Sequence, residues 1–378
     1  MITMKLKYNL YRVYQVLFYI SHGVVSNKYE LLVSLLLGRS KIPLRLTNTN
    51  LKLEFPNTKK ILAMLDLLKI ISISKSYELK PNGVLSISFD GISFFQIPLI
   101  DRTIADEKLI SFLADGFTNG STIIPKEKMN MYALTDKDFI LYDLNGERII
   151  ETLTGAKFFL KYYNYPIVET FTLKVHDMSL LPNLENKIVV DIGADTGNTA
   201  LYFASKGALV YAMEIEKPRY EMILEHITLN PDLAGKIIPV NAGLGKDGEI
   251  EFYSDPLGFM DPTIFKARYD DHLKKPNVQK VKGYTLKSFR THYKLDSIDY
   301  LKMDCKGAEF TLTEDDIKNV KNVKIEYMAL DKDHKIENLL KTFMNVGFKV
   351  RLFKHDSTIY KSFNVSGDIF ATTNHADN

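Results

Sequence analysis

One short stretch, "VVDIGADTGNT" at residues 189–199, constrains the fold more than any other. An apolar run ends at Asp191 and is followed at once by a loop with two glycines, Gly193 and Gly197, and then by a helical pattern. The order of strand, glycine-rich loop and helix is typical of the first turn of a doubly wound α/β domain. The loop is therefore expected to line a ligand crevice.

The chain beyond residue 187 continues this alternation. Amphipathic helical patterns alternate with apolar strands, which we predict at 188–190, 208–213, 237–240, 298–303, 323–328, 348–353 and 368–372. Strands that alternate with helices indicate a mostly parallel sheet with helices on both faces. Residues 245–297 interrupt the alternation as an insert. It contains two strand patterns, "EIEFY" and "VQKVKGY", and a loop or lid at 255–273.

Residues 1–160 have a different character. Helical spacing at 1–40 is followed by two hairpin patterns, with turns at Asp90-Gly91 and Asn145-Gly146, and by helical patterns at 58–68 and 106–113. We predict an α+β region at 1–160 that shapes an acceptor site or binds a partner. An α/β domain, Rossmann-like and doubly wound, is expected at 161–378.

Composition excludes some classes of protein. The single cysteine, Cys305, rules out an intrachain disulfide framework and fits a reducing, cytoplasmic location. A net charge of +3 spread over 378 residues does not by itself imply nucleic acid. The apolar run 31–37 is far shorter than the roughly 20 residues of a membrane span. The tyrosine-rich segment 8–19 leaves two interpretations open, a helix packed on its own domain or a peripheral membrane contact.

The glycine loop restricts the ligand. Asp195 stands where a dinucleotide loop needs its second glycine, and a carboxylate there crowds and repels a pyrophosphate. We therefore expect a nucleoside without phosphate that carries positive charge, and S-adenosylmethionine meets both conditions. Glu214 supports this, because it ends the next strand about 20 residues on, where an acidic side chain takes ribose hydroxyls. The simpler alternative is a helix-capping Asp195 and a solvated Glu214.

Four segments resemble the FkbM-like S-adenosylmethionine-dependent methyltransferases: "IVETF" (167–171), "VVDIGADTGNTALYF" (189–203), "YAMEIEKPRYE" (211–221) and "IDYLKMDCKGAE" (298–309). The resemblance covers roughly residues 165–375. It implies a class I methyltransferase fold with seven strands, one of them antiparallel. It also implies O-methylation of sugar or other natural-product hydroxyls. Two positions depart from the family, which usually has Asn at 195 and Glu at 306, and the Lys306 change reverses a charge near the reaction site.

The predicted cofactor contacts follow from this arrangement: Asp191, Gly193, Ala194, Asp195, Gly197, Asn198 and Thr199 in the loop, with Glu214, Ile215, Asn241 and Glu169 around it. Asn241 ends the third strand, where adenine is expected, although Asn is also common where a strand meets a loop. Glu169 precedes the core, and its segment is expected to lie over the cofactor. A plain surface carboxylate is the alternative.

Candidates for chemistry lie on and after the fourth strand. Lys302 and Asp304 are two residues apart and so share a face of the strand. A buried strand rarely carries two charged residues unless they form an ion pair or take part in the reaction. We expect Asp304 to be a base or an acceptor anchor whose charge Lys302 tunes, or else the two form a structural pair. Glu309 opens the next helix, which the helix dipole alone explains, but the family pattern places it in the site. Of Glu326 and Tyr327, at most one can face the crevice.

The insert offers His272 as a mobile general base on a lid. A metal held by Asp270, Asp271, His272 and Asp304 is the less favoured interpretation, and no metal site is predicted. The basic residues of 274–290 indicate either an RNA-binding edge or a strand with solvated lysines. Three functions stay open: O-methylation of a sugar, glycan or glycolipid hydroxyl; RNA methylation; and cofactor binding without catalysis, which Lys306 suggests.

Overall fold

A computed structural model describes most of the chain. The described residues are 23–37, 39–47, 52–56, 61–89, 95–100, 104–118, 123–126, 131–134, 139–177, 184–255, 261–266, 276–329, 334–354 and 366–373. The chain divides into two compact units, Met1–Leu153 with Lys157–Val168, and Thr154–Ala156 with Glu169–Asn378. The division falls within helix α5 (Pro166–Phe171).

The second unit is built on a seven-stranded sheet. Its order is β13-β12-β11-β17-β18-β20-β19. The strands are β11 (Ile188–Ile192), β12 (Leu209–Glu214), β13 (Ile237–Asn241), β17 (Ile298–Met303), β18 (Val320–Met328), β19 (Lys349–Lys354) and β20 (Ser366–Thr372). β20 runs antiparallel to both its neighbours, whereas the pairs from β13 through β18 are parallel. The predicted doubly wound sheet with one antiparallel strand is confirmed.

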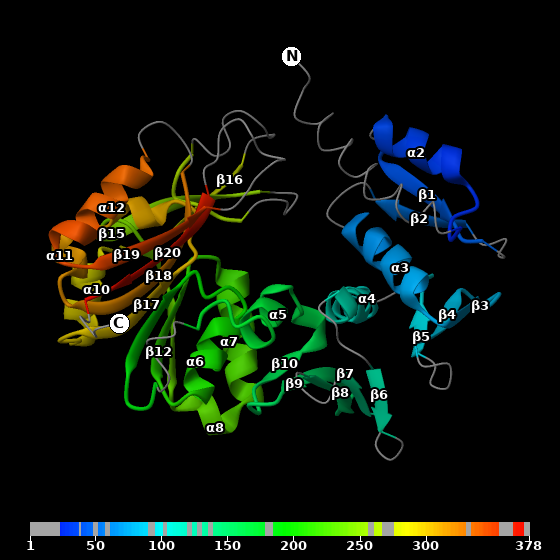
Figure 1. Ribbon diagram of the computed structural model, residues 1–378, viewed down its shortest axis with the longest axis horizontal. Helices are drawn as coiled ribbons and strands as arrows, with labels where there is room; N and C mark the ends of the chain where they lie inside the picture. The colour runs from blue at the N-terminus through cyan, green and yellow to red at the C-terminus, as the bar shows by residue number, and fades with distance from the viewer. Residues whose placement is uncertain are drawn as a thin grey trace. The chain divides into compact units, whose positions relative to one another are not determined.

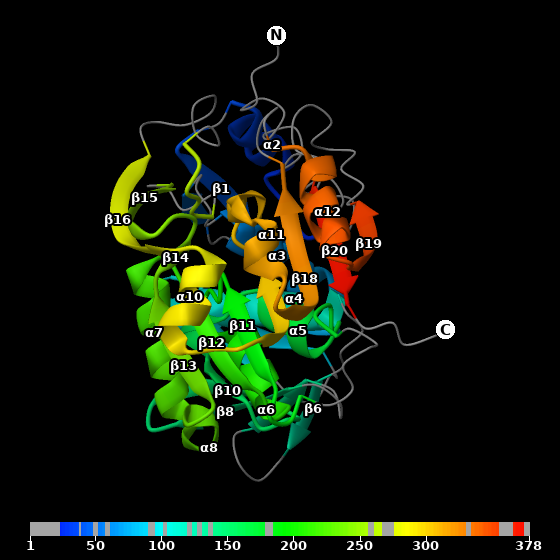
Figure 2. The same cartoon turned by 90° about the vertical axis from the view of Figure 1, so that its left-hand side faces the viewer.

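Helices cover both faces of this sheet (Figures 1 and 2). α6 (Asn198–Ser205) and α7 (Lys217–Leu229) pack on β11, β12 and β13, with the short α8 (Pro231–Ala234) beside them. The opposite face carries α10 (Leu286–Tyr293), the 3₁₀ turn η2 (Ala308–Thr311), α11 (Glu314–Ile317) and α12 (Ile336–Asn345). Gly207 and Gly347, with φ of 99° and 91°, end α6 and α12 in the left-handed region that favours glycine.

The two faces of the sheet differ in chemistry. On the α10–α12 face, alternate strand residues such as Leu301, Val323 and Ile325 form a continuous apolar core. On the other face, Asp191 lies directly beside Lys302, and Lys302 beside Lys324, in the register of β11, β17 and β18. Lys302 Nζ lies 2.9 Å from Asp191 Oδ1, and Lys324 Nζ lies 2.9 Å from Asp368 Oδ1. This buried row of charges is thus balanced by pairs across strands.

The segment predicted as an insert is partly a second sheet. β15 (Gly248–Ser254) and β16 (Asn277–Tyr284) pair antiparallel, as the two strand patterns indicated, and β14 (Gly243–Leu244) joins β16 in parallel. α10, however, lies inside the predicted 245–297 and belongs to the main core through Leu286 and Phe289. Thr285 begins that helix by accepting the N–H of Ser288. The predicted insert at 245–297 therefore extends too far toward the C-terminus, because it includes a helix of the main core.

The first unit is an α+β assembly. Its helices are α2 (Lys28–Leu36), α3 (Ile61–Ile73), α4 (Ile104–Thr118) and the 3₁₀ turn η1 (Leu160–Tyr162). Its strands are β1 (Lys41–Arg45), β2 (Lys52–Pro56), β3 (Ser76–Leu79), β4 (Val84–Ser88), β5 (Phe95–Pro98), β6 (Ile123–Lys126), β7 (Met131–Leu134), β8 (Phe139–Leu144), β9 (Glu147–Thr152) and β10 (Lys157–Phe159). They form sheets of two, three and five strands.

The predicted turn at Asn145-Gly146 joins β8 to β9, and both residues have positive φ, 52° and 85°, as a two-residue hairpin of this type requires. β4 and β5 also pair as predicted, while Asp90-Gly91 and the tyrosine-rich segment 8–19 lie outside the described residues. None of the helices that the structure describes has both the length and the apolar character that a bilayer crossing requires.

Replacing Lys302 by Met tests the buried charge row. The ammonium is lost and the Asp191 carboxylate is left buried without its cation. We expect the free energy of unfolding to fall by about 3–5 kcal/mol, measured by urea denaturation. Lys349→Met, a matched change at an exposed residue of β19, should stay within about 0.5 kcal/mol of the unmodified chain. Equal stability of the two variants would contradict the role given to Lys302.

Candidate functional site

The candidate site lies at the carboxyl ends of β11 and β17. The strand order reverses between these neighbours, because β12 and β13 follow on one side and β18 on the other. In open α/β sheets ligands bind outside the carboxyl ends of the strands at such a reversal. The glycine loop leaves β11 here, and the segment 304–307 leaves β17 beside it.

The glycine loop is shaped by close backbone contacts. A Cβ atom on Gly193 would stand 2.1 Å from the carbonyl oxygen of Asp304, and φ of Gly193 is 74°. Only glycine is compatible with this approach. Asp195 also adopts a left-handed conformation, with φ of 51°, which Asn and Asp tolerate better than most residues. The loop is therefore held against β17 before any ligand arrives.

The carboxylate of Asp191 binds other side chains of the protein. Its Oδ1 atom pairs with Lys302, and its Oδ2 atom accepts the hydroxyl of Thr199. Lys302 Nζ also donates to the carbonyl oxygen of Gly193 at 2.9 Å. The Asp191 and Thr199 side chains, predicted as cofactor contacts, thus fix the loop to the sheet and to α6. Asn198 is buried as well, and its side chain accepts the N–H of Thr199.

Glu214 is the acidic side chain at the end of β12. Its oxygens accept the backbone N–H of Asp195 at 2.8 Å and of Glu216 at 2.9 Å, so it joins the glycine loop to the turn after β12. Burial raises the pKa of Glu214 to about 7, against the lowering effect of the Arg219 guanidinium. Asn241 lies beside it in register and donates to the carbonyl oxygens of Glu214, at 2.9 Å, and Ile215, at 3.3 Å.

Arg219 is a site residue that the sequence analysis missed. It lies in the first turn of α7 and contacts three carboxylates, Asp195 at 2.9 Å, Glu216 at 2.9 Å and Asp261 at 3.3 Å. The signal was present, because an acidic loop followed by an acidic strand end requires a cation nearby. Asp261 comes from the insert, so Arg219 joins the insert to the glycine loop.

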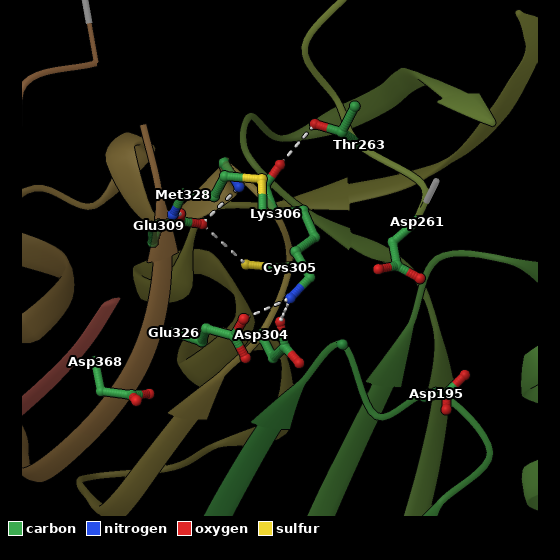
Figure 3. Close-up of polar contacts among 12 residues, drawn as sticks. Asp195, Asp261, Thr263, Asp304, Cys305, Lys306, Glu309, Glu326, Met328 and Asp368 are labelled. Carbon is green, nitrogen blue, oxygen red and sulfur yellow. Dashed lines mark hydrogen bonds and ion pairs between the residues drawn. The ribbon is translucent and has the colours of Figure 1, made fainter. Parts of the chain in front are cut away.

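A second cationic centre lies at the end of β17 (Figure 3). Lys306 Nζ stands 2.6 Å from Asp304 Oδ1 and 2.9 Å from Glu326 Oε1. Burial alone would raise the pKa of Asp304, but the ammonium groups of Lys306 and Lys302 outweigh it and lower the pKa well below its usual range. Of Glu326 and Tyr327, which lie just before the last residue of β18, Glu326 thus reaches this centre, and Tyr327 is buried in the apolar core.

Lys302 and Asp304 do not form the structural pair that was the alternative interpretation of these two residues. Lys302 pairs with Asp191 because the two lie opposite each other in parallel register. Asp304 lies beyond the last residue of β17 and turns to Lys306 instead. Lys302 still lowers the pKa of Asp304, but as the second charge after Lys306.

Glu309 is fully buried and binds backbone. It accepts the N–H of Gly307 and of Met328, both at 2.8 Å, and so ties the loop after β17 to the end of β18. Burial raises the pKa of Glu309 to about 7, against the lowering effect of these N–H groups. Its predicted part in the reaction stays a prediction, and its contacts favour a structural task.

Glu169 lies in α5, ahead of the core. Burial raises its pKa, and the nearby carboxylates of Glu326 and Asp304 raise it further. These two carboxylates stand at the ends of β17 and β18, in the same unit as Glu169. Because the pKa of Glu169 is raised and that of Asp304 is lowered, Glu169 is the stronger base of the two.

Two features were predicted in the insert, the lid with His272 and the basic stretch at 274–290. His272, with Asp270 and Asp271, lies outside the described residues, and within those described no group of His, Cys, Asp and Glu side chains is suited to a metal ion. Two lysines of the basic stretch form ion pairs. Lys280 contacts Glu249 at 2.7 Å, and Lys287 contacts Asp315 at 2.8 Å, which fits the solvated strand better than an RNA-binding edge.

Residues 191–350 match the sequence profile of the family described as "Methyltransferase FkbM domain". The chain contains a methyltransferase FkbM domain. The match begins at the last residues of β11 and ends in β19, and so it holds the glycine loop, Glu214, Asp304 and Lys306. The sequence resemblance is thereby confirmed for this part of the chain. A search of curated proteins finds no significant match.

Several solved structures are similar to the chain. Methyltransferase FkbM from Methylobacillus flagellatus KT is 15% identical over 51% of this chain and 45% of its own, with a TM-score of 0.33. Trm5b from Pyrococcus abyssi is 15% identical over 67% of this chain and 63% of its own, with a TM-score of 0.32. Trm5 from Methanocaldococcus jannaschii, in complex with adenosine, is 14% identical over 92% and 86%, with a TM-score of 0.32. At such TM-scores the fold assignment rests on the strand order itself.

Glu214→Gln tests the buried carboxyl of the FkbM domain through pH. A pKa of about 7 in the folded state, above the ordinary 4.5, stabilises the fold below pH 4.5, and this contribution is lost as pH rises through 7. The free energy of unfolding of the unmodified chain, measured by urea denaturation, should exceed that of the variant at low pH. We expect this difference to shrink by up to about 3 kcal/mol between pH 4.5 and 8.

Glu309 titrates in both chains, so its effect cancels in that comparison. Glu225→Gln, at an exposed residue of α7, serves as the matched control and should show no such trend. Parallel stability curves for the unmodified chain and Glu214→Gln would contradict the assignment.

Proposed function

We propose that the FkbM domain uses S-adenosylmethionine to methylate a hydroxyl oxygen on a sugar, glycan or glycolipid. The observation that carries the proposal is the glycine loop bounded by Glu214 on one side and by Asp304 and Lys306 on the other, at the reversal of the strand order. The reaction class follows from the FkbM domain at 191–350.

The residues present fit a nucleoside without phosphate. Asp195, Glu214 and Glu216 lie at and beside the glycine loop, and Arg219 is shared among Asp195, Glu216 and Asp261. A phosphate would meet carboxylates rather than uncommitted cations, and so would be repelled. Glu214 would accept the ribose hydroxyls, and the backbone of the glycine loop would hold the amino-acid part. The cofactor supplies a methyl group on a sulfonium.

The chain's own groups divide the remaining work. Asp304 stays ionised beside Lys306 and is suited to accept a hydrogen bond that orients the acceptor hydroxyl. Because the same ammonium makes Asp304 a weak base, the proton is better taken by Glu169, whose pKa is raised by burial. The acidic edge formed by Asp304, Glu326 and Glu169 disfavours a phosphate-bearing acceptor such as RNA.

Calorimetry with S-adenosylhomocysteine tests the cofactor half of the proposal. We expect binding by the full-length chain, and Glu214→Gln should weaken it by roughly 10- to 100-fold, because the hydrogen bonds of a charged acceptor are lost. Absence of binding at millimolar ligand would overturn the proposal.

Transfer of tritiated methyl from labelled S-adenosylmethionine to cell lipid, glycan and RNA fractions tests the acceptor half. We expect label in the glycan or glycolipid fraction, and label in RNA alone would favour the RNA alternative. Asp304→Asn should lower kcat/KM by roughly 10- to 100-fold while the chain stays folded. Asp315→Asn, a matched change at an exposed residue of α11, should leave it unchanged.

A further inference from the structure

Lys306 is held in place by its own backbone. Its φ is 49° and that of Gly307 is 117°, so the chain makes a left-handed turn directly after β17. The carbonyl oxygen of Lys306 accepts the hydroxyl of Thr263 at 2.8 Å, and the Gly307 N–H is held by the buried carboxylate of Glu309 at 2.8 Å. The backbone is thus fixed on one side by the insert and on the other by β18.

The ammonium of Lys306 joins two carboxylates that remain partly open. The Lys306 side chain is 13% exposed, whereas those of Asp304 and Glu326 are 32% and 28% exposed. One oxygen of each carboxylate faces Lys306, and the second oxygen of each points away from the ammonium (Figure 3). The three residues together carry one net negative charge, with Lys306 as its centre.

This cluster stands directly beside the glycine loop. The Asp304 N–H donates to the carbonyl oxygen of Ile192 at 2.9 Å, and the Asp304 carbonyl lies against Gly193 so closely that a Cβ atom would not fit. A ligand held by the loop therefore has the Asp304–Lys306–Glu326 cluster as its neighbour at the end of β17.

The surroundings do not cancel the negative charge. Charged and titratable groups interact with the cluster from β17, the segment after it, η2, β18, α5, the insert and the segment after α5: Lys302, Cys305, Glu309, Lys324, Glu169, Asp261 and His176. The two lysines are themselves paired with Asp191 and Asp368. Burial and these lysines lower the pKa of His176 well below its usual value, so it adds no positive charge near neutral pH.

We propose that Lys306 is a positioning residue that preserves the preference of this site for the cationic cofactor over its neutral product as pH falls, by holding Asp304 and Glu326 as an ionised pair beside the glycine loop. The inference rests on the proposed use of S-adenosylmethionine. That cofactor and S-adenosylhomocysteine differ by one methyl group and one positive charge. A negatively charged site therefore binds the cofactor more tightly than the product. The product is released more readily because it lacks the charge.

The ratio of the dissociation constants of S-adenosylhomocysteine and S-adenosylmethionine, measured by calorimetry on the full-length chain from pH 5.5 to 7.5, tests the proposal. Without the ammonium of Lys306, Asp304 gains a proton at higher pH, and the preference for the cation is then lost as pH falls. We expect the ratio in Lys306→Met to fall roughly 3- to 10-fold more over this range than in the unmodified chain. Lys306→Arg should restore the unmodified pH profile.

Two further variants make the result decisive. Lys318→Met, a matched change at a half-exposed residue directly after α11, should behave as the unmodified chain does. Asp304→Asn should lower the ratio by roughly 3- to 10-fold at every pH, and it serves if Lys306→Met does not fold. A ratio in Lys306→Met that follows the unmodified chain at every pH would overturn this inference alone, whereas failure of the unmodified chain to bind either ligand would overturn the proposed function.

Discussion

The site depends on one buried ion pair, Asp191 with Lys302. Both side chains are almost completely removed from water, at 0% and 4% exposure, so each is tolerated only because the other is present. The remaining hydrogen-bonding capacity of the pair is used by Thr199 and by the Gly193 carbonyl. Because these partners belong to α6 and to the glycine loop, the pair fixes the loop to the sheet. A hydrophobic pair would stabilise the strands but could not hold the loop in this way.

Two cations organise the carboxylates around the crevice. Arg219 contacts Asp195, Glu216 and Asp261, and Lys306 contacts Asp304 and Glu326. In each case one cation meets more than one carboxylate, so the candidate site keeps negative charge. The insert contributes to both centres, through Asp261 and through Thr263, which donates to the Lys306 carbonyl. The chemistry that such a crevice favours is that of a cationic nucleoside rather than a nucleotide.

Much of the FkbM domain could be predicted from local signals. Alternation of apolar strands and helices indicated the parallel sheet, and glycine at 207 and 347 marked helix ends because a left-handed backbone is needed there. Asn145-Gly146 indicated a hairpin for the same reason. The helix α10 was missed as part of the core, because the basic residues around Phe289 hide its apolar face and only the packed sheet shows which side is buried.

The sequence by itself determined the order of the strands along the chain, the place of the glycine loop, and the types of side chain at the strand ends, since these follow from short-range periodicity and backbone requirements. The tertiary structure decided which charges meet. Lys302 pairs with Asp191, about 110 residues away in the chain, rather than with Asp304 two residues on, because parallel register places β11 beside β17. Lys306 reaches Glu326 for a similar reason, since only the pairing of β17 with β18 brings the two strand ends together.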